Sequence, residues 1–158
     1  MKKLMLLFAI LFMGLCSFAS ETEEVKQFFN SYIESANSYK SDYFDYYVKN
    51  PVITRVVIKK DGATESVQVP MDEYKRYSNL SMKMGKLRKY KNIYTNIDIA
   101  QEGSNYRLTA MRKPSTSSYS LPVSFLIGKD TAGRWKIKEE SMHTKVQTFL
   151  KKGKKSAS

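Results

Sequence analysis

The last predicted strand, "WKIKEESMH" (135–143), carries the residues best suited to acid–base chemistry. Side chains alternate along a strand, so Trp135 and Ile137 are expected to share a face with Glu139, Ser141 and His143. A carboxylate, a hydroxyl and an imidazole on an enclosed surface can exchange protons with a substrate. Glu139 and His143 are therefore the candidate catalytic residues. The alternative is a solvated strand end, with a bulge that breaks the alternation.

Aromatic residues form a second candidate site. The stretch "SDYFDYYVKN" (41–50) places Tyr43, Phe44, Tyr46 and Tyr47 on a short predicted helix that must end before the next residue, a proline. We expect Tyr47 to point into the interior, with Tyr43 packed beside it. The alternative is ordinary core and rim packing, with the hydroxyls reaching water. The predicted ligand-binding residues are Tyr32, Tyr43, Tyr47, Trp135 and Ser141.

A third candidate is a basic surface on a predicted helix that begins near Asp72 and on its exit. No acidic residue occurs from position 74 to 97. Such a single-sign surface suits an anionic membrane, a cell-wall glycan or an acidic envelope protein. Its tyrosines would also suit nucleic acid, which an exported protein rarely meets. The alternative is a plain solvated helix face. The basic residues are Lys75, Arg76, Lys83, Lys86, Arg88, Lys89 and Lys91.

The composition excludes several kinds of site. The chain has one cysteine, Cys16, and one histidine, His143. Cys16 lies in the N-terminal apolar stretch, so a chain processed after it has no disulfide, thiolate metal site or thiol nucleophile. Glycine-rich phosphate loops and clusters of metal ligands are absent from the sequence. We therefore predict neither a metal nor a cofactor.

Residues 1–19 have the pattern of a signal peptide. Lys2 and Lys3 precede a stretch that is uncharged and mostly apolar, and Ser17 and Ala19 provide the small residues before a cleavage site after Ala19. Lipidation at the cysteine and an uncleaved anchor are the alternatives. The processed chain keeps 25 basic and 15 acidic residues, a net charge of +10. The sequence therefore predicts export to the periplasm or full secretion.

The remaining sequence predicts one α+β domain over residues 20–147, followed by a basic disordered tail at 148–158. Apolar residues at helical spacing indicate a helix at 21–36. The helix near 72–87 shows an apolar side formed by Tyr74, Tyr77, Leu80, Met84 and Leu87. A hairpin turns at Asp61–Gly62. Four later strands alternate, and the first is expected to carry its isoleucines on one face. Three amphipathic helices are available to cover one antiparallel sheet.

This pattern resembles the nuclear transport factor 2-like superfamily, the cystatin-like α+β cone. The resemblance rests on the leading amphipathic helix, the second helix in "SDYFDYYVKNPVI", the helix between hairpin and meander, and the final "DTAGRWKIKEESMH". It implies a strongly bent antiparallel sheet of five to six strands wrapped around three helices, with a pocket at the open end. It transfers no catalytic residue to this chain, because no short motif maps one.

Three functions are compatible with these patterns. The leading hypothesis is an exported, non-catalytic binding protein that holds a small apolar or amphipathic ligand, or an envelope partner, through its aromatic pocket and basic helix. The first alternative is an isomerase- or dehydratase-like enzyme that uses Glu139 or His143 with a pocket tyrosine. The second is an adaptor that forms a homodimer through the open sheet face.

Overall fold

Up to residue 144, helices and strands follow one another in the order that the sequence predicts. The second helix is a 3₁₀ helix that ends at Tyr46, and residues 47–50, which were predicted as helical, begin the next strand. The computed structural model describes residues 2–152 and 154–155, with side chains described from Ser20 to Lys151. The elements are α1 (Lys2–Asn37), the 3₁₀ helix η1 (Ser41–Tyr46), β1 (Tyr47–Ile58), β2 (Thr64–Gln68), α2 (Met71–Arg88), β3 (Asn92–Glu102), β4 (Asn105–Pro114), β5 (Leu121–Lys129), β6 (Trp135–Thr144), α3 (Phe149–Lys152) and β7 (Lys154–Lys155).

The strands form one mixed sheet in the order β3-β4-β5-β6-β1-β2-β7. Strands β3 to β6 form an antiparallel meander, and β1 and β2 form the predicted hairpin. The sheet is not wholly antiparallel, because β1 joins the meander by pairing with β6 in the parallel direction. That parallel pair brings the start of the chain beside its last long strand.

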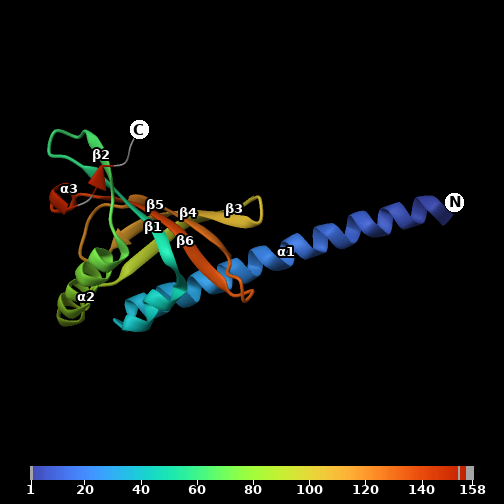
Figure 1. Cartoon of the computed structure of the whole chain (residues 1–158), viewed down its shortest axis with the longest axis horizontal. Helices are drawn as coiled ribbons and strands as arrows, with labels where there is room; N and C mark the ends of the chain where they lie inside the picture. The colour runs from blue at the N-terminus through green and yellow to red at the C-terminus, as the bar shows by residue number, and fades with distance from the viewer. Residues whose placement is uncertain (1, 153, 156–158) are drawn as a thin grey trace.

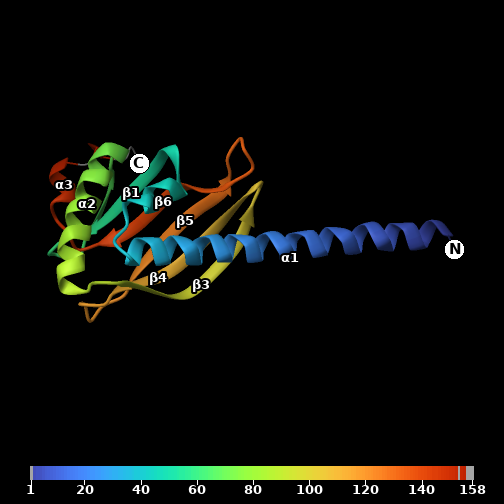
Figure 2. The same ribbon diagram turned by 90° about the horizontal axis from the view of Figure 1, so that it is seen from below.

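Helix α1 lies across one face of the sheet (Figures 1 and 2). Its apolar stripe supplies Val25, Phe29 and Tyr32 to the core, where Phe29 and Tyr32 both contact the ring of Phe125 of β5. At the end of α1, the Asn37 side chain exchanges two hydrogen bonds with the backbone of Asn92, at 2.8 and 2.9 Å. These bonds fix the end of the helix against the start of β3.

Residues 2–19 continue the same helix, so α1 begins well before the predicted start at Glu21. No helix in the described part of the chain has the length and apolar character needed to cross a membrane. The described core begins at Val25. A chain that starts at Ser20 therefore keeps every side chain of that core. The cleavage after Ala19 stays a prediction.

A β-bulge in β6 decides which residues of that strand face the core. Ile137 pairs with Ile127 of β5, but Glu139 pairs with Leu126, so Lys138 is an extra residue. Ile137 and Glu140 are consequently both buried. The predicted sharing of one face by Ile137 and Glu139 is wrong, and the alternative of a bulge is confirmed.

A second bulge changes which side chains of β3 lie on the same face of the sheet. Asn96 has φ 52°, and the pairing of β3 with β4 skips between Thr95 and Asp98. The isoleucines of β3 therefore do not share one face as predicted. Ile93 is exposed, whereas Ile99 is partly buried and packs on the core.

Helix α2 packs through only one edge of the apolar side that the sequence predicts, the edge that carries Tyr74. Tyr74 and Gly85 are its buried residues, and Gly85 lets the helix approach the ring of Tyr39. Leu80, Met84 and Leu87, which were expected in the core, are exposed. Tyr74, Gly85 and the partly buried Met71 and Met82 thus face the domain, whereas the two leucines do not.

Part of the segment predicted as a disordered tail contributes to the domain. Helix α3 occupies 149–152, and the Phe149 ring lies 5.7 Å from that of Tyr77 in an edge-on contact. Phe149 is partly buried against the core. The prediction of a tail from residue 148 is therefore wrong at its beginning. Residues 153 and 156–158 lie outside the described residues.

Candidate functional site

A buried cluster of polar side chains lies inside the domain, where α1, α2, β1 and β6 meet. We call it the tyrosine–glutamate cluster; its members are Tyr32, Tyr47, Arg55, Tyr74 and Glu140. Glu140 is only 1% exposed, and its Oε1 lies 2.7 Å from Arg55 Nη2. This contact is an ion pair that lacks the geometry of a direct hydrogen bond.

The tyrosine hydroxyls complete the surroundings of the carboxylate. Tyr47 donates a short hydrogen bond to Glu140 Oε2, and Tyr74 donates to the same oxygen at 3.3 Å. Because a phenol has one proton to donate, Tyr32 must be the donor in its 3.0 Å bond to the Tyr47 oxygen. The result is a directed chain from Tyr32 through Tyr47 to Glu140.

Burial sets the ionisation of these tyrosines. Desolvation and the Glu140 charge raise the pKa of Tyr47 well above its ordinary value. Desolvation and the neighbouring Tyr74 do the same to the pKa of Tyr32, and the pKa of Tyr74 is raised by desolvation and Glu140. Burial lowers the pKa of Arg55, but the Glu140 charge outweighs that effect and the net change is upward. The cluster thus holds one charge pair and neutral phenols.

The arrangement of these groups suits structure better than proton transfer. Arg55 and two hydroxyls already occupy the Glu140 carboxylate. The guanidinium of Arg55 also lies 5.0 Å from the ring centre of Tyr74 and 5.8 Å from that of Phe149. A substrate could reach the carboxylate only after one of these partners had moved.

Beside this cluster a cavity of about 440 Å³ opens at the rim of the domain. We call it the rim cavity. It lies between the start of β1, the first turn of α2 and the β5–β6 turn. Its apolar lining is Phe44, Tyr47, Val48 and Met71, and its charged lining is Asp45, Lys49, Lys75, Arg134 and Lys136.

The rim cavity carries an excess of positive charge. Arg134 pairs with Asp130 at 3.0 Å, and Lys136 donates to the backbone oxygen of Asp45. Lys75 lies 5.7 Å from the centre of the Phe44 ring. Lys49 and Lys75 belong to no ion pair among the described residues. Two cations are therefore available to an anionic group in a partly apolar cavity.

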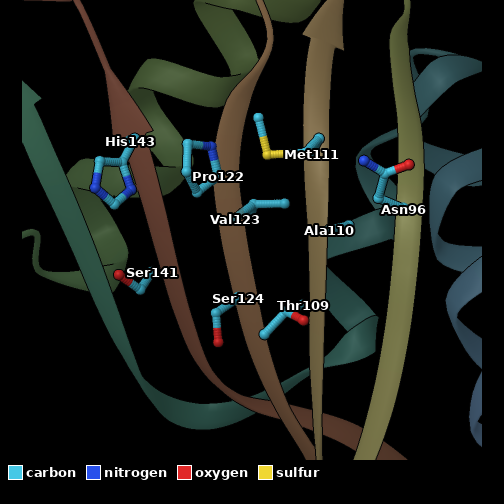
Figure 3. Close-up of a pocket in the computed structure, with 9 residues that line it drawn as sticks. All are labelled: Asn96, Thr109, Ala110, Met111, Pro122, Val123, Ser124, Ser141 and His143. Atoms are coloured by element: carbon cyan, nitrogen blue, oxygen red, sulfur yellow. The ribbon is translucent and has the colours of Figure 1, made fainter.

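A second cavity, of about 280 Å³, lies on the outer face of the sheet (Figure 3). We call it the outer hollow. Ser141 and His143 of β6 lie at one side of it and Asn96 of β3 at the other. The other lining residues are Thr109, Ala110, Met111, Pro122, Val123 and Ser124. The lining therefore includes no lysine, arginine or carboxylate side chain.

The structure brings together only some of the predicted site residues. Tyr32, Tyr43 and Tyr47 are buried and in contact with one another, as expected. Trp135 lies elsewhere: its indole donates to Glu24 at 3.0 Å and its ring packs edge-on against Tyr106.

The candidate catalytic residues lie on the outer face. Glu139 is paired with Arg107 at 3.1 Å, and His143 lines the outer hollow with Ser141. The bulge at Lys138 puts Glu140, instead of Glu139, inside the domain. Sequence reasoning missed Glu140, Arg55 and Tyr74. The one available signal was Arg55, a charge within the apolar run "VITRVVI".

All seven residues of the predicted basic surface are exposed on α2 and its exit. Arg76 is paired with Glu73 at 2.5 Å. Lys89 ends the helix in a left-handed conformation, with φ 50°. Within the described residues, no group of three or more acidic, histidine or cysteine side chains is placed to hold a metal.

No protein-family model matches this sequence, and no curated protein does. Solved structures do match. An NTF2-like protein of unknown function from Pseudomonas putida is 9% identical, covers 89% of this chain and 97% of its own, and has a TM-score of 0.62. The chain has the nuclear transport factor 2-like fold. An NTF2-like protein from Shewanella oneidensis, also of unknown function, is 16% identical over 78% of this chain and 99% of its own, with a TM-score of 0.58.

A third NTF2-like neighbour, from Streptomyces avermitilis, has a provisional assignment as a dehydratase. It is 12% identical over 79% of this chain and 96% of its own, with a TM-score of 0.58. At such identities the likeness extends to the NTF2-like fold alone. The chemistry of this chain must be argued from its own residues.

The buried ion pair yields a first prediction. Arg55→Met leaves Glu140 charged and without its cation, so it is expected to lower the free energy of unfolding by about 3–5 kcal/mol. Adding Glu140→Leu removes the stranded charge and is expected to recover at least half of that loss. Urea unfolding of the two single variants and the double variant measures the coupling. Additive losses would contradict the pairing.

The tyrosines yield a second prediction. Their pKa values are raised in the folded protein, so the stability that they contribute is complete below the unfolded value of about 10 and is lost above it. Each such tyrosine lowers the free energy of unfolding by about 1.4 kcal/mol per pH unit there. Urea unfolding between about pH 9 and 11.5 measures this slope. Tyr47→Phe removes one titrating group, so it should reduce the slope by that amount; an unchanged slope would contradict the prediction.

Proposed function

We propose that this protein is an exported, non-catalytic binding protein of the cell envelope that holds a small amphipathic anion in the rim cavity. The observation that carries the proposal is that one cavity combines an apolar wall with Lys49 and Lys75, which belong to no ion pair among the described residues. The basic face of α2 is its contact surface for the envelope. Export rests on the signal-peptide pattern of residues 1–19.

The lining of the rim cavity favours a ligand with one charged end and one apolar end. Its volume of about 440 Å³ is in the range of small-molecule sites. Phe44, Val48 and Met71 offer apolar contact, while Lys49 and Lys75 attract a carboxylate or phosphate. A medium-chain fatty acid has this chemistry.

The same geometry makes catalysis the weaker hypothesis. The Glu140 carboxylate is occupied by Arg55 and two tyrosines. Glu139 and His143 lie on the opposite face of the sheet from this cluster, and Glu139 is occupied by Arg107. Binding without chemistry therefore uses the groups as they are arranged, whereas an isomerase or dehydratase would need them rearranged.

Calorimetric titration of the chain starting at Ser20 tests ligand binding. Decanoate is expected to bind, because its carboxylate meets Lys49 and Lys75 and its chain meets the apolar wall. Decanol should bind at least tenfold more weakly and decyltrimethylammonium not measurably, since they lack the negative charge. Lys49→Gln with Lys75→Gln is expected to weaken decanoate binding by at least tenfold, about 1.4 kcal/mol.

The matched control removes two lysines outside the cavity, Lys26 and Lys60, which are both exposed. Lys26→Gln with Lys60→Gln has the same net charge as the test variant and should bind decanoate as the wild type does. Equal binding of decanoate and decanol, or equal losses in the two variants, would contradict a site in the rim cavity.

The outer hollow supports a second candidate function, assembly through the sheet face. The chain has 27 basic residues, yet the lining of this hollow contains no lysine, arginine or carboxylate side chain. The hollow is therefore an uncharged area on a basic protein. Val52 and Ile93 are exposed on strands of the same sheet. Burial of such a face between two copies would form a homodimer.

Sedimentation and light scattering of the chain starting at Ser20 test the dimer. The wild type is expected to dimerise with rising concentration, and Ser141→Arg is expected to be monomeric because it places a charge in the hollow. Lys60→Ala serves as the folded control. A strict monomer at high concentration, or a dimer that Ser141→Arg leaves intact, would contradict assembly through this face.

A further inference from the structure

Helix α2 presents three large apolar side chains to solvent. Leu80, Met84 and Leu87 are 63%, 45% and 80% exposed. An α-helix advances by about 100° per residue, so these side chains lie within about 60° of one another and form one stripe. We call it the outer ridge. Isolated exposed apolar residues are ordinary, but three aligned on one helix form a surface.

The outer ridge points away from the domain. Tyr74 and Gly85, the buried residues of α2, lie roughly 120–140° around the helix from Leu80. The helix itself lies at the end of the molecule opposite the N-terminus of α1 in both views (Figures 1 and 2). A flat surface could therefore meet the ridge along the helix axis.

Positive charge borders the ridge on both sides. Lys83 and Arg88 lie on either side of the ridge, each within roughly 80° of Leu80 around the helix axis. Both side chains are exposed. Lys86, Lys89 and Lys91 extend the basic surface, and no acidic residue occurs from 74 to 97. Apolar side chains at the apex of a helix with cations on its flanks form the arrangement that lies in a lipid interface.

The charges beside the ridge also disfavour a second copy of the chain or a glycan as its binding partner. A second copy of the chain would bring Lys83 and Arg88 against their equivalents, so like charges would oppose the contact. A glycan could pair with the lysines but would leave Leu80 and Leu87 in water. An anionic bilayer satisfies both features, because its head groups attract the cations and its acyl boundary accepts the apolar side chains.

We infer that α2 docks this protein on anionic phospholipid membranes by inserting Leu80, Met84 and Leu87 into the head-group boundary, with Lys83 and Arg88 on lipid phosphates. The inference rests on the proposed envelope role of the basic helix and specifies its partner. It does not depend on ligand binding in the rim cavity, which the decanoate titration measures separately.

Vesicle sedimentation of the chain starting at Ser20 tests the inference, because the apolar leader would itself bind lipid. Vesicles of phosphatidylglycerol with phosphatidylcholine are expected to retain the wild type, and vesicles of phosphatidylcholine alone should retain at least tenfold less. Leu80→Ser with Leu87→Ser keeps the charge of the helix and should weaken retention at least tenfold. Decanoate titration and urea unfolding of that variant should match the wild type, since neither side chain packs in the core.

A charge-matched pair of variants separates the helix from general attraction. Lys83→Glu with Lys86→Glu is expected to abolish retention, whereas Lys26→Glu with Lys60→Glu, on other surfaces, should reduce it less than threefold. In Leu87→Trp, the indole is expected to shift its emission to the blue on anionic vesicles and not on neutral ones. Raising the salt from about 50 to about 500 mM should weaken the wild type.

Three results would overturn the inference. The first is wild-type retention of the double variant Leu80→Ser with Leu87→Ser while the double variant Lys83→Glu with Lys86→Glu is lost from the vesicles. It would show that binding is electrostatic and involves no insertion of apolar side chains. Equal losses in the two charge-reversed variants would show attraction by net charge alone. Absence of retention on anionic vesicles by a wild type that still binds decanoate would exclude the membrane while leaving the proposed ligand function in place.

Discussion

The ion pair between Arg55 and Glu140 is the constraint around which the rest of the domain is arranged. Its side chains are 5% and 0% exposed, so neither charge has water to solvate it. A buried charge of this kind is tolerated only when its partners are complete. Tyr47 and Tyr74 supply the remaining hydrogen bonds. Elements from distant parts of the sequence must therefore meet at one point.

This requirement explains features that look unrelated in isolation. The bulge at Lys138 turns Glu140 inward. The parallel pairing of β1 with β6 places Arg55 on the neighbouring strand, opposite Met142. Tyr47 comes from the same strand as Arg55, and Tyr74 from the buried side of α2. With α2 fixed through Tyr74, the side chains of Leu80, Met84 and Leu87 lie on its solvent side and form the outer ridge.

The interior and the surfaces of this protein consequently have different tasks. The groups of the tyrosine–glutamate cluster are engaged with one another through the ion pair and the tyrosine hydrogen bonds, which suits the cluster to holding the fold together. The surfaces next to it carry groups that the fold leaves available: Lys49 and Lys75 at the rim cavity, and the outer ridge on α2. Binding roles are therefore proposed at the rim cavity and on α2 and not at the buried cluster.

The sequence by itself determined the fold class, the amphipathic first helix and the order of the elements up to β6, because these follow from local periodicity and turn residues. The inward position of Tyr47 was expected on a helix, whereas Tyr47 begins β1. The sequence also determined the exposed basic surface, since its seven cations lie close together along the chain. The tertiary structure alone decided the faces of β3 and β6, because one extra residue in a strand reverses every later side chain. It likewise decided that Glu140 and not Glu139 is buried, and that Leu80 and Leu87 are exposed. The positions of Glu140 and α2 depend on Arg55 and Tyr74, whose contacts with Glu140 join residues far apart in the chain, and no local sequence pattern records such contacts.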